Sequence, residues 1–140
     1  MNNKILLEAV DKFRTPLYIY DSNMIKSQYN RLKQSFKDVK NLQINYAVKA
    51  LSNISILKYM INMGSGIDAV SIQEVKLALK AGVNPKKILY TPNGVSIEEI
   101  KEVSELGVSI NIDNLEVLEQ FGNLNPDIPV CIRINPHIMA

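Results

Sequence analysis

Apolar and polar residues follow two different periods along this chain. Short apolar runs, which are typical of buried strands, are separated by longer stretches in which apolar residues recur every third or fourth position, as on one face of a helix. Strands are predicted over residues 17–20, 43–49, 66–70, 87–90, 108–112 and 129–134. Helices are predicted between these runs, so strands and helices alternate along the chain.

Most of the predicted helices begin and end at recognisable residues. Ser71 with Glu74, and Ser96 with Glu99, have the spacing of a capping box, in which side chains bond the free amides at the start of a helix. Glycine is common where a helix stops, because it adopts a left-handed conformation without strain. The predicted caps of the other helices are Asp21 or Ser22, Asn53 and Asp113, and the predicted stops are Gly64, Gly82, Gly107 and Gly122.

Alternating strands and helices with short connections predict a parallel α/β fold, for which two layouts compete. A doubly wound dinucleotide fold would carry G-x-G-x-x-G after its first strand, and neither that pattern nor a P-loop occurs. In a (β/α)8 barrel, polar side chains collect at the carboxyl ends of the strands, as they do in this sequence. Five predicted strands follow residue 42. The sequence therefore predicts a partial TIM-type barrel, with about five of the eight strands.

Composition narrows the class of protein further. The chain has 140 residues, 46% apolar and 21% charged, which is enough for one domain with a core. The net charge of +2 comes without a basic run, so no nucleic-acid partner is predicted. No long apolar stretch or convincing signal peptide occurs, so no membrane association is predicted. The single cysteine, Cys131, lies in an apolar run, and we expect a small core residue in a reducing, cytoplasmic protein.

Lys49 is the most informative candidate functional residue. It ends the predicted strand 43–49, where an unpaired buried ammonium would be strongly disfavoured. The strand alone leaves two explanations open. Either the side chain reaches solvent while its stem is buried, or its amine is a nucleophile that forms a Schiff base.

Asp68 and Arg133 also lie in predicted strands, near their ends, and in a barrel they would meet Lys49 on one face. Thr91–Gly94 is explained by turn chemistry and Asp113 by helix capping, but these three residues have no such local explanation. A lysine amine, a carboxylate that positions it and an arginine for an oxygen anion suit pyridoxal phosphate chemistry. An ion cluster that satisfies only itself is an equal alternative, and spacing alone does not separate the two.

Longer motifs around these residues resemble one known family. Residues 46–51 (YAVKAL) lead into Ile56, Leu57, Met60 and Gly64 at a spacing similar to the cofactor-attachment signature of the fold-type III pyridoxal-phosphate-dependent amino-acid decarboxylases. These include ornithine, arginine and diaminopimelate decarboxylases. Residues 15–20 and 66–74 resemble further segments of the family, and residues 131–136 (CIRINP) have the form typical of diaminopimelate decarboxylases. The resemblance covers essentially the whole chain, although many relatives have Asn or Cys in place of Leu51.

The resemblance implies a fold, a cofactor and a set of site residues. The fold would be an incomplete barrel of the alanine racemase/decarboxylase type over residues 21–140, and residues 1–20 would join a second β domain in the complete protein. Pyridoxal 5'-phosphate would be the cofactor, and no metal is implied. The implied site residues are Lys49, which would hold the cofactor covalently, Asp68 as the acid near that linkage, Ala47 beside the lysine, and Arg133 on the cofactor side of the barrel. His137 is interpreted as an ordinary loop residue.

The implied reaction is the decarboxylation of meso-diaminopimelate to lysine, the last step of lysine biosynthesis, in a cytoplasmic homodimer. The alternatives are a related decarboxylase acting on ornithine, arginine or carboxynorspermidine, and a non-catalytic homologue that binds pyridoxal phosphate. An alanine-type racemase fits the Arg133 segment less well. The family's glycine-rich phosphate loop and its second domain have no counterpart in residues 1–140, which stop directly after a predicted strand. We therefore expect part of a longer protein, with little activity by itself.

Overall fold

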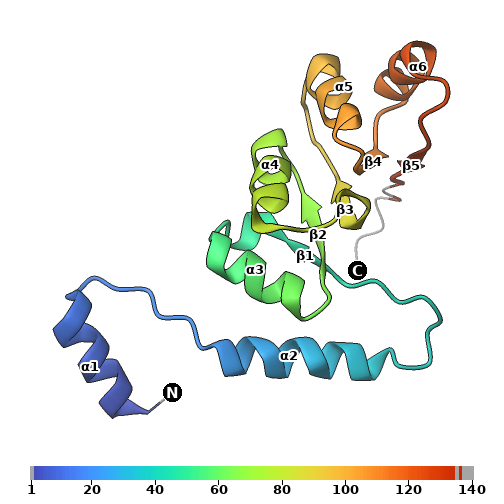
Figure 1. Ribbon diagram of the computed structural model, residues 1–140. Coiled ribbons are helices and arrows are strands. Elements are labelled where there is room, and N and C mark those ends of the chain that lie inside the picture. The colour runs from blue at the N-terminus through green and yellow to red at the C-terminus, as the bar shows by residue number, and fades with distance from the viewer. Residues whose placement is uncertain (1, 135, 137–140) are drawn as a thin grey trace. The chain divides into compact units, whose positions relative to one another are not determined.

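The backbone of the chain separates into two compact units, residues 1–42 and residues 43–140 (Figure 1). The computed structural model describes residues 2–134 and 136. Among these, the first unit holds two helices, and the second holds all the strands and the remaining helices. The residues predicted to form a site therefore all belong to the second unit.

Two helices, α1 (Asn3–Phe13) and α2 (Ser22–Ser35), make up most of the first unit. Each begins at a side chain that accepts hydrogen bonds from free amides of the first turn, Asn2 for α1 and Asp21 for α2. The predicted cap Asp21 is confirmed, whereas α1 was not predicted. The strand predicted over residues 17–20 is wrong, because a strand needs a hydrogen-bonded neighbour and no described strand pairs with this segment.

The second unit alternates strands and helices. Its strands are β1 (Asn45–Ala47), β2 (Gly66–Ala69), β3 (Ile88–Tyr90), β4 (Ser109–Ile112) and β5 (Val130–Ile132). Its helices are α3 (Ile54–Asn62), α4 (Ile72–Ala81), α5 (Ile97–Glu105) and α6 (Leu115–Leu124), with 3-10 turns η1 (Val48–Ala50) and η2 (Pro85–Lys87). Each strand lies inside one of the runs predicted after residue 42, so those five predictions are confirmed.

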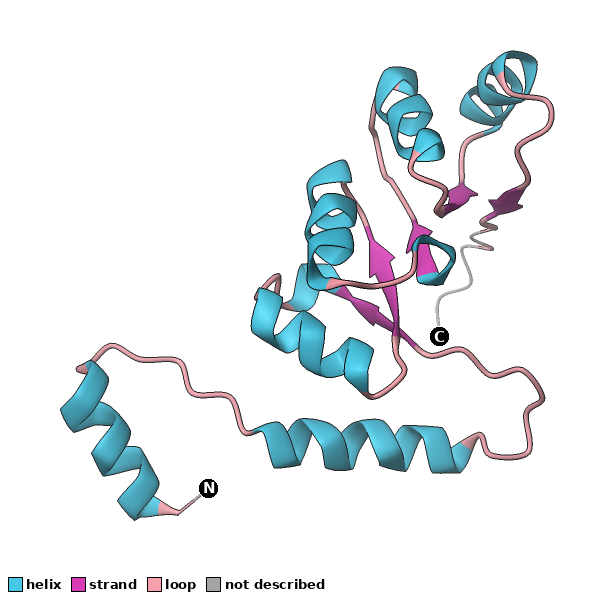
Figure 2. Cartoon of the chain, viewed as in Figure 1, coloured by secondary structure: helices cyan, strands magenta, loops and turns pink. Residues whose placement is uncertain are grey.

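The five strands of the described residues form one parallel sheet in the order β1-β2-β3-β4-β5. Each strand therefore neighbours the next along the chain, and α3 to α6 follow one another along one face of the sheet (Figure 2). A doubly wound sheet reverses its strand order at a switch point, whereas a barrel adds strands in sequence with its helices outside. The order found is that of part of a barrel, as predicted.

The core of the second unit lies between the sheet and these helices. Alternate residues of β2, β3 and β4 point toward the helices, and each is at most 3% exposed: Ile67, Ala69, Ile88, Tyr90, Ile110 and Ile112. The helices contribute Leu57, Val75, Val103 and Phe121 to the same apolar cluster. Burial of apolar surface is the main favourable term in folding, so this face stabilises the unit. Because strand side chains alternate in direction, the intervening residues face the other side.

The predicted capping boxes are half formed. Ser71 accepts a hydrogen bond from the Glu74 amide and Ser96 accepts one from the Glu99 amide, each at 3.3 Å. The Glu74 carboxylate does not return to Ser71 but accepts from the Val70 amide at 2.8 Å. Both serines thus cap their helices as predicted, while the glutamates bond elsewhere.

Glu99 joins three elements of the core. Its Oε1 accepts a hydrogen bond from the Tyr90 hydroxyl at 2.7 Å and another from the Ile72 amide at 3.0 Å. Glu99 therefore links α5 to β3 and to the first turn of α4. Burial and the neighbouring Glu99 carboxylate both raise the pKa of Tyr90 above its ordinary value, burial having the larger effect.

Two predicted helix ends are wrong. Asn114, not Asp113, caps α6, because its Oδ1 is the atom that accepts from the amides of the first turn. Gly122 lies inside α6, which continues to Leu124. A glycine inside a helix lowers the stability of the helix but does not have to end it. Gly122 keeps a helical conformation, whereas Gly82 adopts the left-handed conformation, with a φ of 97°, at the residue that ends α4.

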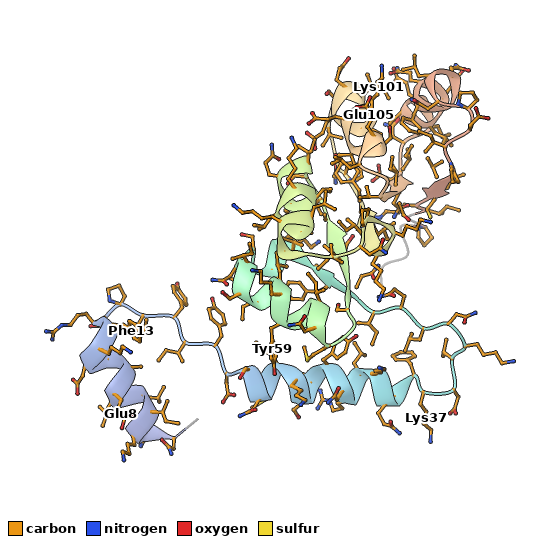
Figure 3. All side chains as sticks on the ribbon, in the orientation of Figure 1. Glu8, Phe13, Lys37, Tyr59, Lys101 and Glu105 are labelled. Carbon is orange, nitrogen blue, oxygen red and sulfur yellow. The ribbon has the colours of Figure 1, made fainter. Side chains whose placement is uncertain are left out.

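The outer surfaces of the helices carry charged side chains. Lys76 of α4 and Glu102 of α5 form an ion pair at 2.8 Å, and Lys101 and Glu105 are exposed on α5 (Figure 3). Exposed pairs contribute about 0–1 kcal/mol, so the core accounts for more of the stability than these charges do. None of the described helices combines the length and the apolar character needed to cross a membrane.

Candidate active site

The face of the sheet opposite the helices carries a hollow of about 600 Å³. Residues from each strand, or from the segment directly after it, line this hollow: Asn45, Lys49, Asp68, Val70, Leu89, Thr91, Asn93, Asn111 and Arg133. Most of them lie toward the carboxyl ends of the strands, where barrel enzymes place their active sites. The structure thus brings Lys49, Asp68 and Arg133 to one hollow, as the sequence analysis expected.

Lys49 lies in the turn η1, two residues beyond the end of β1, and is exposed. The strand was predicted to end at Lys49, but β1 ends at Ala47, because the chain then turns and the Leu51 amide donates to the Val48 carbonyl at 3.0 Å. The Tyr46 hydroxyl donates to the Leu51 carbonyl at 3.2 Å, which fastens the turn to β1. The ammonium of Lys49 therefore stays in contact with solvent and avoids the cost of burial.

Asp68 is half-buried on β2, where it pairs with Ala47 of β1 and Leu89 of β3. Its Oδ1 accepts a hydrogen bond from the Thr91 hydroxyl at 3.0 Å. Within the described part of the chain, Thr91 is its one hydrogen-bonding partner. Turn chemistry does not account for this bond, because it joins neighbouring strands across 23 positions of sequence.

Arg133 follows β5 and extends its pairing, since its amide donates to the Ile112 carbonyl at 2.8 Å. No ion pair joins Lys49, Asp68 and Arg133 among the residues that the structure describes. The self-satisfied ion cluster is therefore not formed in this structure. Two cationic side chains and one carboxylate line the hollow, so its charge favours an anionic ligand.

Asn111 lines the hollow as well, although it was not among the predicted site residues. It lies on β4 opposite Cys131, and its Oδ1 is buried without a hydrogen-bond partner among the described residues. A buried amide oxygen without a donor is unfavourable, so a donor from a ligand or a water molecule would satisfy it. The available sequence signal is one polar residue between Ile110 and Ile112 in an apolar strand.

The described lining of the hollow does not include Tyr46, Ala47 or Cys131. Ala47 is half-buried at the end of β1, where it pairs with Asp68 of β2. Tyr46 packs against the core. Cys131 is exposed, so its predicted place in the core is wrong. Among the described strands, β5 has a neighbour on one side only. Cys131 also pairs with Asn111, so its side chain lies on the face of the sheet that carries the hollow and not on the face that the helices cover. His137 lies outside the described residues.

Residues 22–140 match the family described as "Pyridoxal-dependent decarboxylase, pyridoxal binding domain". The chain belongs to this family. Among its curated relatives, the diaminopimelate decarboxylase of Campylobacter jejuni subsp. jejuni is 42% identical over 134 residues, which cover 92% of this chain and 33% of the relative. The chain spans about a third of the length of the curated relatives that it matches.

Solved structures of amino-acid decarboxylases share the fold. Diaminopimelate decarboxylase from Helicobacter pylori, complexed with L-lysine, matches with a TM-score of 0.82 and 36% identity over 98% of this chain and 35% of its own. Lysine/ornithine decarboxylase from Vibrio vulnificus, complexed with cadaverine, matches with a TM-score of 0.84 and 25% identity over 94% of this chain and 36% of its own. The predicted fold class, a partial α/β barrel of the decarboxylase type, is confirmed.

Pyridoxal phosphate, the predicted cofactor, is the one that the family description indicates, and the residues of the hollow fit it. Lys49 offers an accessible amine for an aldehyde. The Arg133 guanidinium has the forked donors that suit phosphate or carboxylate oxygens. The buried Oδ1 of Asn111 has no donor among the described residues, so a ligand could supply one. In a pyridoxal-dependent decarboxylase, this hollow is therefore the candidate active site.

Proposed function

We propose that the complete protein containing this chain is a pyridoxal-phosphate-dependent decarboxylase that converts meso-diaminopimelate to lysine and carbon dioxide. The observation that carries this proposal is the hollow where Lys49, Asp68 and Arg133 come together at the carboxyl ends of parallel strands. The decarboxylase family and the diaminopimelate decarboxylases among the relatives support it.

Lys49 is the proposed attachment residue for the cofactor. Its amine, in the unprotonated form, is the nucleophile needed for an aldehyde, and its exposed position beside the hollow gives it access. When bound, pyridoxal phosphate supplies an electron sink for the bond that breaks at the α-carbon of an amino acid. The turn η1 holds Lys49 next to this position.

Asp68 and Arg133 are the proposed charged partners within the site. Thr91 already donates to Oδ1 of Asp68, which leaves the other carboxylate oxygen free to accept from a cationic amine. Arg133 would bind an oxygen anion of the cofactor or of the substrate through two parallel hydrogen bonds. Ala47 completes the proposed binding set, since it pairs with Asp68 of β2 and its small side chain leaves room for a ligand there.

Diaminopimelate is the preferred substrate because the relatives that carry its name are the more similar ones. Diaminopimelate decarboxylases reach 42% identity, against 25% for the lysine/ornithine decarboxylase of Vibrio vulnificus. The structure of the Helicobacter pylori enzyme with L-lysine agrees with lysine as the product. Decarboxylation of ornithine, arginine or carboxynorspermidine is the second candidate, and the match to the lysine/ornithine decarboxylase of Vibrio vulnificus supports ornithine among these.

The remaining parts of the proposal concern assembly and location. We propose a homodimer in the cytoplasm that serves lysine biosynthesis, with residues 1–20 leading into a second β domain and residues 21–140 forming part of the barrel. A small-molecule amino acid is the proposed partner, with no nucleic acid or membrane. Size-exclusion chromatography with light scattering on the complete protein would test the dimer.

The decisive experiment uses the complete protein loaded with pyridoxal phosphate. Borohydride reduces the linkage between cofactor and protein to a stable bond, and peptide mass spectrometry then locates the modified lysine. We expect the modification on Lys49. Carbon dioxide release is then measured with meso-diaminopimelate, ornithine, arginine and carboxynorspermidine, and we expect the first to be the best substrate.

The matched control is Lys58→Ala, because Lys58 is an exposed lysine of α3 that does not line the hollow. Lys49→Ala should lose the modification and the carbon dioxide, whereas Lys58→Ala should keep both. A modification on another lysine would contradict the attachment site. A modified Lys49 without carbon dioxide from any substrate would instead identify a non-catalytic homologue.

A further inference from the structure

Thr91 is placed rigidly beside the hollow, directly after β3. Its amide donates to the Ala69 carbonyl at 2.8 Å, so its backbone continues the pairing of β3 with β2. Threonine is branched at Cβ and has few side-chain rotamers. The hydroxyl is therefore held by the sheet itself, and it donates to Oδ1 of Asp68 at 3.0 Å.

Asp68 depends on this hydroxyl for its orientation. The terminal torsion of an aspartate is broad, so a carboxylate without fixed donors rotates freely. The described residues offer Asp68 no hydrogen-bond partner other than Thr91 and no ion pair. Since Asp68 and Lys49 line the same hollow, the orientation of this carboxylate decides which oxygen faces a cationic amine there.

We propose that Thr91 is a positioning residue of the candidate active site. Its hydroxyl holds the Asp68 carboxylate in one orientation and thereby raises the affinity of the site for a pyridoxal-type aldehyde. This inference rests on the proposed function, because it assumes that the hollow takes up the cofactor. Thr91 acts through Asp68 and needs no contact with the cofactor.

Three variants of the complete protein separate the hydroxyl from the shape of the side chain. Thr91→Val keeps the branched shape and removes the donor, Thr91→Ser keeps the donor, and Asp68→Asn keeps an acceptor without the charge. Loss of one hydrogen bond to a charged group corresponds to a factor of about ten or more in affinity. We expect Thr91→Val to weaken pyridoxal phosphate binding about tenfold and Thr91→Ser to stay within about threefold of the parent.

A double-mutant cycle shows whether Thr91 acts through Asp68. The dissociation constant for pyridoxal phosphate is measured by visible absorbance, together with the pH midpoint of the change in that absorbance. If the hydroxyl works by orienting the carboxylate, Thr91→Val should have little further effect in an Asp68→Asn background. The midpoint should move to lower pH in Thr91→Val alone, because a mobile carboxylate stabilises a protonated cationic linkage less well.

Two results would overturn the inference while leaving the proposed function intact. In one, Thr91→Val binds pyridoxal phosphate as the parent does, with the same pH midpoint. In the other, the effects of Thr91→Val and Asp68→Asn multiply as independent changes. If the parent protein takes up no pyridoxal phosphate at Lys49, the proposed function fails first and the inference falls with it.

Discussion

The two faces of the sheet differ sharply, although their residues alternate along the same strands. Ile67 is fully buried under the helices, while the next residue, Asp68, lines the hollow and accepts a hydrogen bond from Thr91. Ile110 and Asn111 repeat this contrast on β4. One face stabilises the fold through apolar burial, and the other leaves polar groups available to a ligand.

The contrast shows that strand register sets both stability and site. A shift of one residue in any of these strands would exchange the two faces and remove the polar groups from the hollow. Substitutions on the hollow face should therefore change binding and catalysis with little effect on stability. Substitutions on the helix face should do the reverse.

The largest expected effect comes from Lys49 on the hollow face. We expect Lys49→Ala in the complete protein to reduce carbon dioxide release by a factor on the order of 10³ or more, because the attachment amine is lost. The free energy of unfolding should change by less than about 0.5 kcal/mol, since the side chain is exposed. Steady-state kinetics and urea unfolding measure the two quantities. A large loss of stability would show that Lys49 has a structural role instead.

Ile67 provides the counterpart on the helix face. Ile67 is fully buried in the core, so Ile67→Ala should lower the free energy of unfolding by about 2–4 kcal/mol, and Ile67→Val by about 0.5–1.5 kcal/mol. Asp68→Asn, one position further along β2, should change stability by less than about 0.5 kcal/mol. Urea unfolding of the three variants compares the faces directly. Similar destabilisation by Ile67→Ala and Asp68→Asn would refute the division of roles.

Tyr90 makes the helix face sensitive to alkaline pH. Its buried hydroxyl donates to Glu99, and the pKa of Tyr90 lies above the ordinary value of 10.0, chiefly because of burial. The unfolded chain therefore loses this proton at a lower pH than the folded protein does. The resulting stabilisation is complete below about pH 10 and is lost as the pH rises through the raised pKa.

Tyr90→Phe tests this linkage. At neutral pH it should cost about 1–2 kcal/mol, because Glu99 loses a hydrogen bond from the hydroxyl. Above pH 10, the parent should lose stability more steeply than Tyr90→Phe, so the difference between them should shrink. Unfolding midpoints at pH 8 to 11 measure both effects. Parallel pH profiles for the two proteins would contradict the role assigned to burial.

Local signals in the sequence predicted well the strands and helices that build the covered face of the sheet. The five strands, the serine caps at Ser71 and Ser96, and the left-handed stop at Gly82 depend on residues close together in the chain. The same kind of signal failed where a neighbour was missing or another element competed. Residues 17–20 pair with none of the described strands, and Gly122 stays within α6.

The hollow face was predicted less completely, because its contacts join distant segments. The sequence pointed to Lys49, Asp68 and Arg133 but not to the hydrogen bond between Thr91 and Asp68, which joins the segment after β3 to β2. The Oδ1 of Asn111 has no hydrogen-bond partner in the described part of the chain, and this too depends on how the strands align. The sequence pattern shows which residues of a strand are polar, but the hydrogen bonds between them depend on how neighbouring strands are aligned.

The smallest expected effect concerns Ser96, which supports the helix face from a distance. Ser96 is exposed and caps α5, and Ser96→Ala should cost about 1 kcal/mol because the Glu99 amide loses its acceptor. Ser96→Asp restores an acceptor at a helix start and should recover most of this loss. Glu99 also holds Tyr90 and the first turn of α4, so fraying of α5 should reach the core. Hydrogen exchange at the Ile72 amide measures whether the loss of the cap reaches α4. We expect faster exchange in Ser96→Ala than in Ser96→Asp. Equal exchange rates would show that the effect of the cap stays within α5.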